Sequence, residues 1–545
     1  MKKINGNKPL QLLALLAIFI LGGLYGAKKQ VILPQKPSPP ITVHRNQAAS
    51  VNKKATKVGS QQNIKTPQQR APRQMALAAK VTNNKRYYLL DAPNDPKYAN
   101  QWVLSAVHAP SAWAISPNAA NVVVADIDTG FALDHQDLKD QWYINTGETG
   151  NTSEGDACWT GAPADKKTNQ CDDDGNGYDD DWRGWDFYAV DNTPQAGSVN
   201  PSGDGVDHGT ETAGLIGAST NNGIGMASIS GGVQLMPLQV MSDTGVGYSS
   251  DIAAAIYYAT DNGAKVINMS LGTSGDDPAV RDAVDYAVAH NVVVVAAAGN
   301  CGNGTQDVCS GQVAGYVTFP ANYDKVVAVG AVDQSGVRAS FSSYGQRVDM
   351  VAPGSGTLVS TTYVQGNNAA YEVGSMYGTS FASPIVASAA ALIRSIRPNS
   401  TIDDIRALLM ASTQRLGGMS GNYYTRYYGH GLLDVGKSLQ VASDLNAMSE
   451  SVPTLFVAGN YKAEKQYRAA DALGGGCEAP AGTWCTVWLR NTTENYDRYL
   501  PYTKTNADNE AGWSWSGSVL EKGEWSIRAR QGNAVSDTPH ILFSK

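Results

Sequence analysis

Short runs of apolar residues alternate along the middle of the chain with stretches in which apolar positions recur every three or four residues. Five runs follow the first pattern, at residues 121–130, 233–240, 264–272, 291–300 and 325–332. Two stretches of the second kind, at residues 250–263 and 278–290, lie between such runs. Continuous apolar runs are typical of strands buried on both faces, and their alternation with helices predicts a parallel sheet. We therefore expect an α/β domain whose functional residues lie at the carboxyl ends of its strands.

The pattern changes after about residue 435. Residues 452–545 hold five of the eleven tryptophans, among strand-like pieces such as TWCTVWLR and GEWSIRAR. This composition predicts a small all-β domain at residues 446–545. Its tryptophans have two interpretations, a face that binds carbohydrate or protein and the core of a small domain, and we favour the core.

The amino-terminal part has neither pattern. Lysines precede an uncharged apolar run at residues 10–27, which is the layout of a secretory signal and is also nearly long enough to cross a membrane. We expect residues 1–27 to be a signal peptide or a retained signal anchor, and only the anchor would make a membrane a partner. Residues 28–90 are polar, basic and rich in Pro and Gln, so we expect a disordered linker or pro-segment there. The α/β domain then occupies residues 91–445.

Net charge and cysteine content limit the partners and the cellular location that we expect. The 545 residues carry a net charge of −7 at pH 7, so a nucleic acid is not an expected partner. The six cysteines are close in sequence as three pairs, Cys158 with Cys171, Cys301 with Cys309 and Cys477 with Cys485. An even number in short loops predicts disulfides and an oxidising location, secreted, periplasmic or at the cell surface. Zinc is disfavoured because no C-x-x-C or H-x-x-x-H spacing lies beside them.

Three glycine-flanked turns carry the residue types that acyl transfer needs. VVVADIDTG presents Asp128, GDGVDHGTETAG presents His208, and YGTSFASP presents Ser380 ahead of a long apolar run. Acyl-transfer enzymes use a nucleophile, an imidazole that takes and returns its proton, and a carboxylate that orients the imidazole. The apolar run predicts a buried helix, whose N-terminus at Ser380 favours developing negative charge. Taken singly, the three are equally a turn aspartate, a capping histidine and an N-cap serine.

In the chain order Asp, His, Ser, these motifs resemble the three signatures of the subtilisin-like serine peptidases, over about residues 94–435. The resemblance implies a parallel sheet covered by helices and an exported serine endopeptidase that cleaves peptide bonds through an acyl-enzyme. His208 would be the general base and then the acid, Asp128 would orient it, and Ser380 would be the nucleophile. Asn300, which ends VVAAAGN, matches the asparagine that donates to the oxyanion with the backbone N–H of Ser380.

The same resemblance implies where peptide and protein substrates bind. The peptide would lie as an added strand between two edges of the cleft. The residues implied are Ser270, Leu271, Gly272, Gly245 and Gly247 for the edges, and Ala297, Ala298 and Thr318 for the pocket of the residue before the cut. A threonine at position 318 would favour small to medium side chains in that pocket.

Calcium is the cofactor that the sequence suggests, at two places. CDDDGNGYDDD puts oxygen ligands at alternate positions, as an EF-hand loop begins, although Arg183 stands where the bidentate glutamate would fall. Acids so close together repel one another without a cation, which favours structural calcium over a solvated turn. By resemblance, the family's strong calcium loop pairs Asp137 with TNNGIGM. The candidate ligands are Asp172, Asp174, Asn176 and Asp180 at the first place, and Asp137 and Asn222 at the second.

Glu211 departs from the family pattern, which commonly has a second histidine after His-Gly-Thr. One helical turn from His208, its carboxylate has two interpretations: it stabilises the imidazolium and raises the pKa of His208, or it faces solvent.

Two other functions compete with an active endopeptidase. The first is a subtilisin-like scaffold without activity that binds or adheres through its C-terminal domain, and it is disfavoured because all four catalytic positions are filled. The second is a lipase or esterase, which needs Gly-x-Ser-x-Gly and the order Ser, Asp, His, whereas Phe381 and Ala382 follow Ser380.

Overall fold

The structure is a computed structural model, and the residues that it describes all belong to the unit Tyr87–Lys545. It describes residues 92–543 apart from 198–202, 204, 305–308, 448–452, 459–465, 468–471, 508–509, 517–522 and 537–539. The predicted signal segment and linker, residues 1–27 and 28–90, lie outside the described residues.

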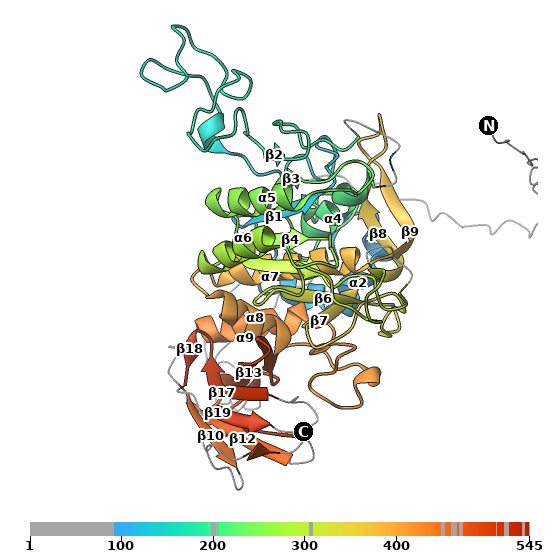
Figure 1. Cartoon of the computed structure of the whole chain (residues 1–545), viewed down its shortest axis with the longest axis vertical. Coiled ribbons are helices and arrows are strands. Elements are labelled where there is room, and N and C mark those ends of the chain that lie inside the picture. Colours follow the sequence, from blue (N-terminus) through green and yellow to red (C-terminus); the bar gives the residue numbers. More distant parts are fainter. Residues whose placement is uncertain are drawn as a thin grey trace, which may run out of the picture. The chain divides into compact units, whose positions relative to one another are not determined.

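A seven-stranded parallel sheet forms the centre of the α/β part, in the order β2-β3-β1-β4-β5-β6-β7 (Figure 1). The five apolar runs form five of its strands, so the predicted fold class is confirmed. The strands are β1 (Val123–Asp128), β2 (Trp185–Asp186), β3 (Gln234–Gln239), β4 (Val266–Met269), β5 (Val293–Ala297), β6 (Val327–Val332) and β7 (Met350–Pro353). The hairpin β8 (Ser355–Thr361) and β9 (Tyr371–Tyr377) is a separate antiparallel pair.

Successive side chains of the central strands enter two hydrophobic cores, because a strand turns alternate residues to opposite faces. In β5, Val293 and Val295 lie in one core and Val294 and Ala296 in the other. Helices α4, α7 and α9 contribute to the first core, and α5 and α6 contribute to the second. The helices are α2 (Trp102–Ala106), α3 (Ala109–Trp113), α4 (His208–Gly217), α5 (Ser249–Asp261), α6 (Pro278–Ala289), α7 (Thr379–Ile396), α8 (Ile402–Met410) and α9 (Val435–Asn446), with 3-10 turns η2 (Tyr98–Asn100), η3 (Thr146–Glu148) and η5 (Gly417–Met419).

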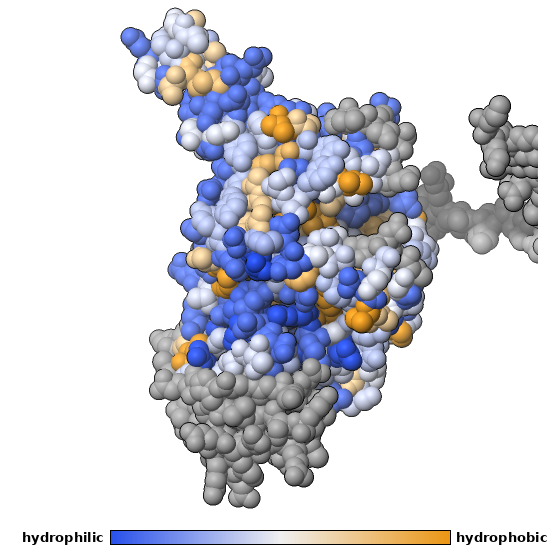
Figure 2. Space-filling view, in the orientation of Figure 1, coloured by the Kyte–Doolittle hydropathy of each residue, from blue (hydrophilic) through white to orange (hydrophobic). Residues whose placement is uncertain are grey.

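Helix α7 begins at Thr379, as the apolar run after Ser380 predicts. Among the described residues it is the one helix long and apolar enough to cross a membrane, yet 83% of that window is buried inside the folded chain. It is therefore the central core helix of this unit. By contrast, the face shown in Figure 2 is mainly hydrophilic, with hydrophobic residues in small separate patches.

The order in which successive strands are added to the sheet reverses at β1, because β3 pairs with one edge of β1 and β4 pairs with the other. Such a point opens a crevice outside the carboxyl ends of the strands. Asp128 ends β1, Ser270 follows β4, and Asn300 comes three residues after β5. All three candidate residues therefore meet at one edge of the sheet.

The C-terminal region is all β, as predicted. Its sheets are β10-β12-β16 and β11-β19-β17-β13-β14, in which most pairs are antiparallel. Trp525 is 0% exposed and lies in a hydrophobic cluster of this region, which agrees with the core interpretation. Trp488 is 8% exposed and packs instead in the first core of the α/β part. The strands are β10 (Thr454–Ala458), β11 (Gln466–Tyr467), β12 (Ala472–Glu478), β13 (Trp484–Asn491), β14 (Tyr496–Tyr499), β15 (Thr503–Lys504), β16 (Glu510–Ser516), β17 (Gly523–Gln531), β18 (Ala534–Val535) and β19 (His540–Phe543). The domain limits at 90 and 445 stay predictions, the second of them close to the end of α9.

A buried ion cluster joins this region to the α/β part. Asp497 of β14 accepts from Arg406 of α8 at 2.6 Å and from Arg490 at 3.1 Å, and Lys325 lies 3.7 Å away. Trp488 also donates its indole N–H to Asp497 at 2.8 Å. Burial alone would raise the pKa of Asp497, but these three cations hold it well below its usual value. We call these five side chains the Asp497 cluster.

The three disulfides form as predicted from sequence proximity. They join Cys158 to Cys171, Cys301 to Cys309 and Cys477 to Cys485.

Candidate active site

Asp128 and His208 meet where β1 ends and α4 begins. His208 Nδ1 donates to Asp128 Oδ1 at 2.7 Å, and the backbone N–H of Thr129 donates to the same oxygen at 2.7 Å. Asp128 is 1% exposed. This hydrogen bond fixes the imidazole tautomer and leaves Nε2 for the cleft. The close approach needs glycine after His208, because a Cβ at Gly209 would lie 2.4 Å from the carbonyl oxygen of Gly130.

Charge around the imidazole favours its protonated form. Burial lowers the pKa of His208, but the charge and hydrogen bond of Asp128 outweigh it, and Glu211 and Asp126 add to the same effect. Together they raise the pKa of His208 to about 9. The site therefore stabilises the imidazolium that forms when the histidine accepts a proton.

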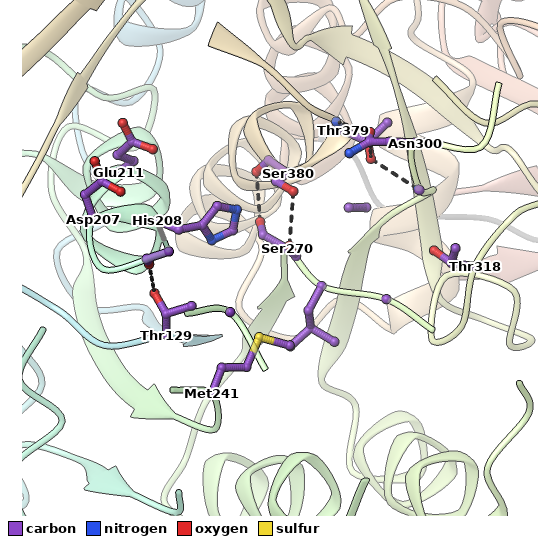
Figure 3. Close-up of a pocket in the computed structure, with 16 residues that line it drawn as sticks. Thr129, Asp207, His208, Glu211, Met241, Ser270, Asn300, Thr318, Thr379 and Ser380 are labelled. Carbon is purple, nitrogen blue, oxygen red and sulfur yellow. Dashed lines mark hydrogen bonds between the residues drawn. The ribbon is translucent and has the colours of Figure 1, made fainter. Parts of the chain in front are cut away.

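Ser380 is held by reciprocal hydrogen bonds with Ser270. Pro384, four residues on in α7, has no N–H for the carbonyl of Ser380, and the hydroxyl of Ser270 donates to that carbonyl instead at 2.8 Å. The hydroxyl of Ser380 donates to the carbonyl of Ser270 at 3.1 Å. No hydrogen bond joins Ser380 to His208 within the described residues, although the two side chains lie side by side in one cleft (Figure 3). Such contacts are often loose without substrate.

Asn300 is oriented by the start of α7. The N–H and hydroxyl of Thr379 both donate to Asn300 Oδ1 at 3.0 Å. The amide oxygen is thereby engaged, and the amide nitrogen points toward Ser380 (Figure 3). Since Asn300 lines the cleft, its N–H₂ can donate to an oxyanion that forms at Ser380.

A cleft of about 360 Å³ contains these groups. Its lining includes the expected Gly245, Ser270, Leu271, Gly272, Ala297 and Thr318, together with Thr129, Gly205, Asp207, Glu211, Met241, Gly299 and Thr379. Two expected residues are placed elsewhere. Ala298 is fully buried and its carbonyl accepts from the N–H of Thr318, and Gly247 lines a neighbouring cavity.

Thr318 forms one wall of the pocket near Asn300. A Cβ at Gly272 would lie 2.5 Å from the hydroxyl of Thr318, so glycine keeps that pocket open. The neighbouring cavity, of about 130 Å³, shares Met241, Leu271 and Gly272 with the cleft. Its other walls are largely apolar and include Ile252, Val280, Phe319 and Tyr323. The sequence analysis did not identify this second cavity.

Asp126, which the sequence analysis did not identify, lies behind Asp128. Asp126 is two positions before Asp128 in β1, so both side chains lie on the same face of the sheet. Its carboxyl accepts from Asn268 and from Thr212, each at 2.8 Å. Burial and then the charge of Asp128 raise the pKa of Asp126 to about 8. The alternation of the strand was a signal that could have identified it.

The acidic loop gathers around a residue from outside it. Glu148, Asp172 and Asp174 each offer a carboxylate oxygen within 4.8 Å of the others. Glu148 is 0% exposed, and its Oε2 has no hydrogen-bond partner, whereas its Oε1 accepts from the N–H groups of Asp173 and Asp174. Burial and acidic neighbours raise the pKa of Glu148 to about 7. This residue lies 24 positions before Asp172, so no local spacing pointed to it.

The other expected ligands of this loop divide into two groups. Asn176 is near the three carboxylates, since its side-chain amide donates to Asp181 at 2.8 Å and its N–H donates to Asp174. Asp180 faces away, because both its oxygens accept from the N–H of Gln170. Asp181 faces the cluster in its place.

The two residues of the second expected calcium place, Asp137 and Asn222, lie next to each other. Asp137 is 1% exposed and accepts from the side chain of Asn222 at 2.9 Å and from the N–H of Met226. Asp95, which the sequence analysis did not single out, accepts from the N–H groups of Asn221 and Asn222. Burial and the charge of Asp95 both act to raise the pKa of Asp137, which is about 6.

The sequence of this chain is similar to one protein family and to several known proteins. The Subtilase family matches residues 119–431. Subtilisin DY of Bacillus licheniformis is 41% identical over 241 residues, which are 44% of this chain and 79% of that protein. The thermophilic serine proteinase of a Bacillus strain is 36% identical over 62% of this chain and 68% of that protein. Thermitase of Thermoactinomyces vulgaris is 32% identical over 335 residues, which are 61% of this chain and 95% of that protein.

Proposed function

We propose that Asp128, His208, Ser380 and Asn300 are the catalytic residues of this chain. The premise is that the chain belongs to the subtilase family and is a serine-type endopeptidase. The observation that carries the proposal is the 2.7 Å hydrogen bond between His208 and Asp128 at the edge of the cleft that also holds Ser380 and Asn300. A nucleophile, a base, an orienting carboxylate and an oxyanion donor thus share one cleft.

The steps follow from these positions. The hydroxyl of Ser380 leaves the carbonyl of Ser270, gives its proton to His208 Nε2 and attacks the peptide carbonyl carbon. The amide nitrogen of Asn300 and the backbone N–H of Ser380 donate to the oxyanion, and Asp128 stabilises the imidazolium. His208 then protonates the leaving amine as the C–N bond breaks. Water, deprotonated by His208, releases the acyl group and restores Ser380.

The test is labelling by a fluorophosphonate probe, with casein hydrolysis measured in parallel. We expect the full chain to be labelled and to cleave casein, and Ser380→Ala to lose both while keeping its melting temperature. Ser375→Ala, an exposed serine on β9, is the matched control and should keep both activities. Labelling that survives in Ser380→Ala, or a folded and processed chain that is never labelled, would contradict the proposal and favour a binding scaffold without activity.

The size and polarity of the two cavities should determine which substrate side chains the enzyme prefers. Because Thr318 narrows the pocket near Asn300, the residue before the cut is expected to be small to medium in size. The neighbouring apolar cavity suits a hydrophobic side chain farther from the cut. Peptides that differ only in Ala, Leu or Trp before the cut test the first expectation, and a preference for Trp would contradict it.

Calcium is the proposed structural cofactor at the acidic loop, where Glu148, Asp172, Asp174 and Asn176 are the proposed ligands. A buried carboxyl group with one oxygen that has no partner, beside two other carboxylates, fits a divalent cation that prefers oxygen ligands. Glu148 would then supply the carboxylate that an EF-hand loop has at the position occupied here by Arg183. Asp137 and Asn222, with Asp95 beside them, are the proposed second place.

An exported location, secreted, periplasmic or at the cell surface, is proposed because three disulfides fit an oxidising compartment. Fractionation of the producing cells would test it, and recovery of the reduced chain from the cytosol would contradict it.

A further inference from the structure

Glu211 is a buried carboxylate without a partner in the catalytic cleft. It lies in the first turn of α4, three residues after His208, and is 8% exposed. It lines the cleft with His208 and Ser380, yet no hydrogen bond or ion pair engages its carboxylate among the described residues. Its carboxylate borders the cleft beside the imidazole without a protein donor, so it is available to a cationic group that enters the cleft.

Its neighbours are mostly acidic as well. Burial raises the pKa of Glu211 most, the charges of Asp207, Glu372 and Asp128 add to that, and His208 opposes them. The result is a pKa of about 8. Asp207 lines the same cleft from the start of α4, and Glu372 is exposed on β9. This wall of the cleft therefore concentrates negative charge from two elements.

The wall lies on the leaving-group side of Ser380. In Figure 3, His208 separates Asp207 and Glu211 from Ser380, whereas Asn300 and Thr318 lie on the far side of Ser380. The pocket near Thr318 takes the residue before the cut, and His208 protonates the leaving amine. A side chain that passes the imidazole toward Glu211 therefore belongs to the residues after the cut.

We propose that Glu211, with Asp207 and Glu372, binds a lysine or arginine side chain of the substrate, so that this endopeptidase prefers a cationic residue at the first or second position after the cut. The inference rests on the proposed catalytic role of Ser380 and His208, and it names the substrate class that their cleft selects. Glu211 is a specificity-determining residue, since it contacts the substrate away from the reacting atoms.

The preference should depend on pH in a defined direction. Below a pKa of about 8 the carboxyl of Glu211 is mainly protonated, and above it the group is an anion. A bound guanidinium favours the anion, so binding at neutral pH releases a proton and is weaker than at high pH. The charged groups that act on Glu211 are Asp207 just before α4, His208 of α4, Asp128 of β1 and Glu372 of β9.

The experiment uses the full chain and quenched peptides that differ in one residue, arginine or its neutral isostere citrulline. The pair is placed in turn at the second position before the cut and at the first and second positions after it. At pH 9 we expect kcat/KM to be about 10-fold to 100-fold higher for arginine at one of the two positions after the cut. The ratio should fall at pH 6.5, where arginine itself remains charged.

Variants test whether the acidic side chains Glu211 and Glu372 cause the preference for arginine. Glu211→Gln keeps the shape of the side chain and should reduce the arginine to citrulline ratio to about twofold or less, with a smaller reduction for Glu372→Gln. Glu154→Gln, at an exposed carboxylate in the loop after η3, is the matched control and should keep the full ratio. If Glu211→Gln does not fold, the pH dependence of the ratio in the natural chain still tests the proposal.

The outcomes are separable. Equal rates for both peptides at every position, or a preference only before the cut, would overturn this inference while leaving the endopeptidase proposal intact. An arginine preference that persists in Glu211→Gln would also overturn it. Absence of fluorophosphonate labelling would instead be a failure of the proposed catalytic residues.

Discussion

The catalytic cleft and the Asp497 cluster both bring charged side chains into protected surroundings, but they differ in how completely those groups are partnered. Asp497 has two arginines, a lysine and an indole N–H around it. In the cleft, by contrast, the amide nitrogen of Asn300 and the carboxylate of Glu211 form no hydrogen bond among the described residues.

The difference separates structure from function. A buried charge whose partners are all supplied by the protein holds two parts of the chain together. A polar group that the fold leaves without a partner costs stability and is available to a substrate or an ion. By this criterion the cleft and the acidic loop around Glu148 are sites. Asp497 is a joint, because groups of the chain donate to both of its oxygens, although the Nε of Arg406 beside it is buried without a hydrogen bond.

The largest effect is expected at the joint. Asp497→Asn removes the charge that compensates Arg406 and Arg490, and we expect the free energy of unfolding to fall by about 3–5 kcal/mol. Denaturant unfolding measures it. Arg281→Gln breaks the exposed ion pair with Asp276 and should cost less than about 1 kcal/mol. Equal losses in the two variants would contradict the assignment of Asp497 as a joint.

Asn300→Ala should act on the reaction and leave the fold unchanged. Loss of one oxyanion donor is expected to lower kcat by about 10²–10³-fold with little change in KM, because the donor acts mainly in the transition state. Steady-state hydrolysis of a peptide measures both constants. A rise in KM at constant kcat would assign Asn300 to substrate binding instead.

Removal of calcium should have a moderate effect on stability. Excess EGTA is expected to lower the melting temperature by several degrees, since an ion that binds only the folded state stabilises it. Glu148→Gln should shrink that shift, whereas Asp179→Asn, an exposed acid of the same loop, should not. No shift with EGTA in the natural chain would exclude both proposed places.

The smallest expected effect is a difference in pH dependence between the activity of the cleft and the stability that the Asp497 cluster provides. His208 must be neutral to act as a base, and its pKa of about 9 predicts that kcat/KM rises as the pH increases toward that value. Glu211→Gln removes one group that raises this pKa, so the rise should move to lower pH.

The joint should not respond to the same change of pH. The pKa of Asp497 is held below its usual range, and a lowered pKa gives stability that is lost only when the pH falls through it. Its contribution should therefore stay constant between pH 6 and pH 9, as measured by denaturant unfolding of Asp497→Asn and the natural chain. A pH-dependent difference between them would contradict this.

Local sequence determined much of this protein. Apolar runs specified five strands of the parallel sheet because a strand buried on both faces must be apolar along its length. The glycine-flanked turns indicated Asp128, His208 and Ser380 as candidates, since chemistry restricts the residue types that a turn at a strand end or helix start presents. The disulfides followed from sequence proximity, because short loops close most easily.

Only the tertiary structure decided which side chains share an environment. The spacing of the acidic loop suggested Asp180, whereas the fold turns Asp181 inward and brings in Glu148 from 24 residues earlier. Glu211 had two interpretations in the sequence, and the fold buries most of its side chain at the wall of the cleft. Burial and long-range neighbours set the pKa of a carboxyl group and leave it without a partner, and neither is encoded in the residues beside it.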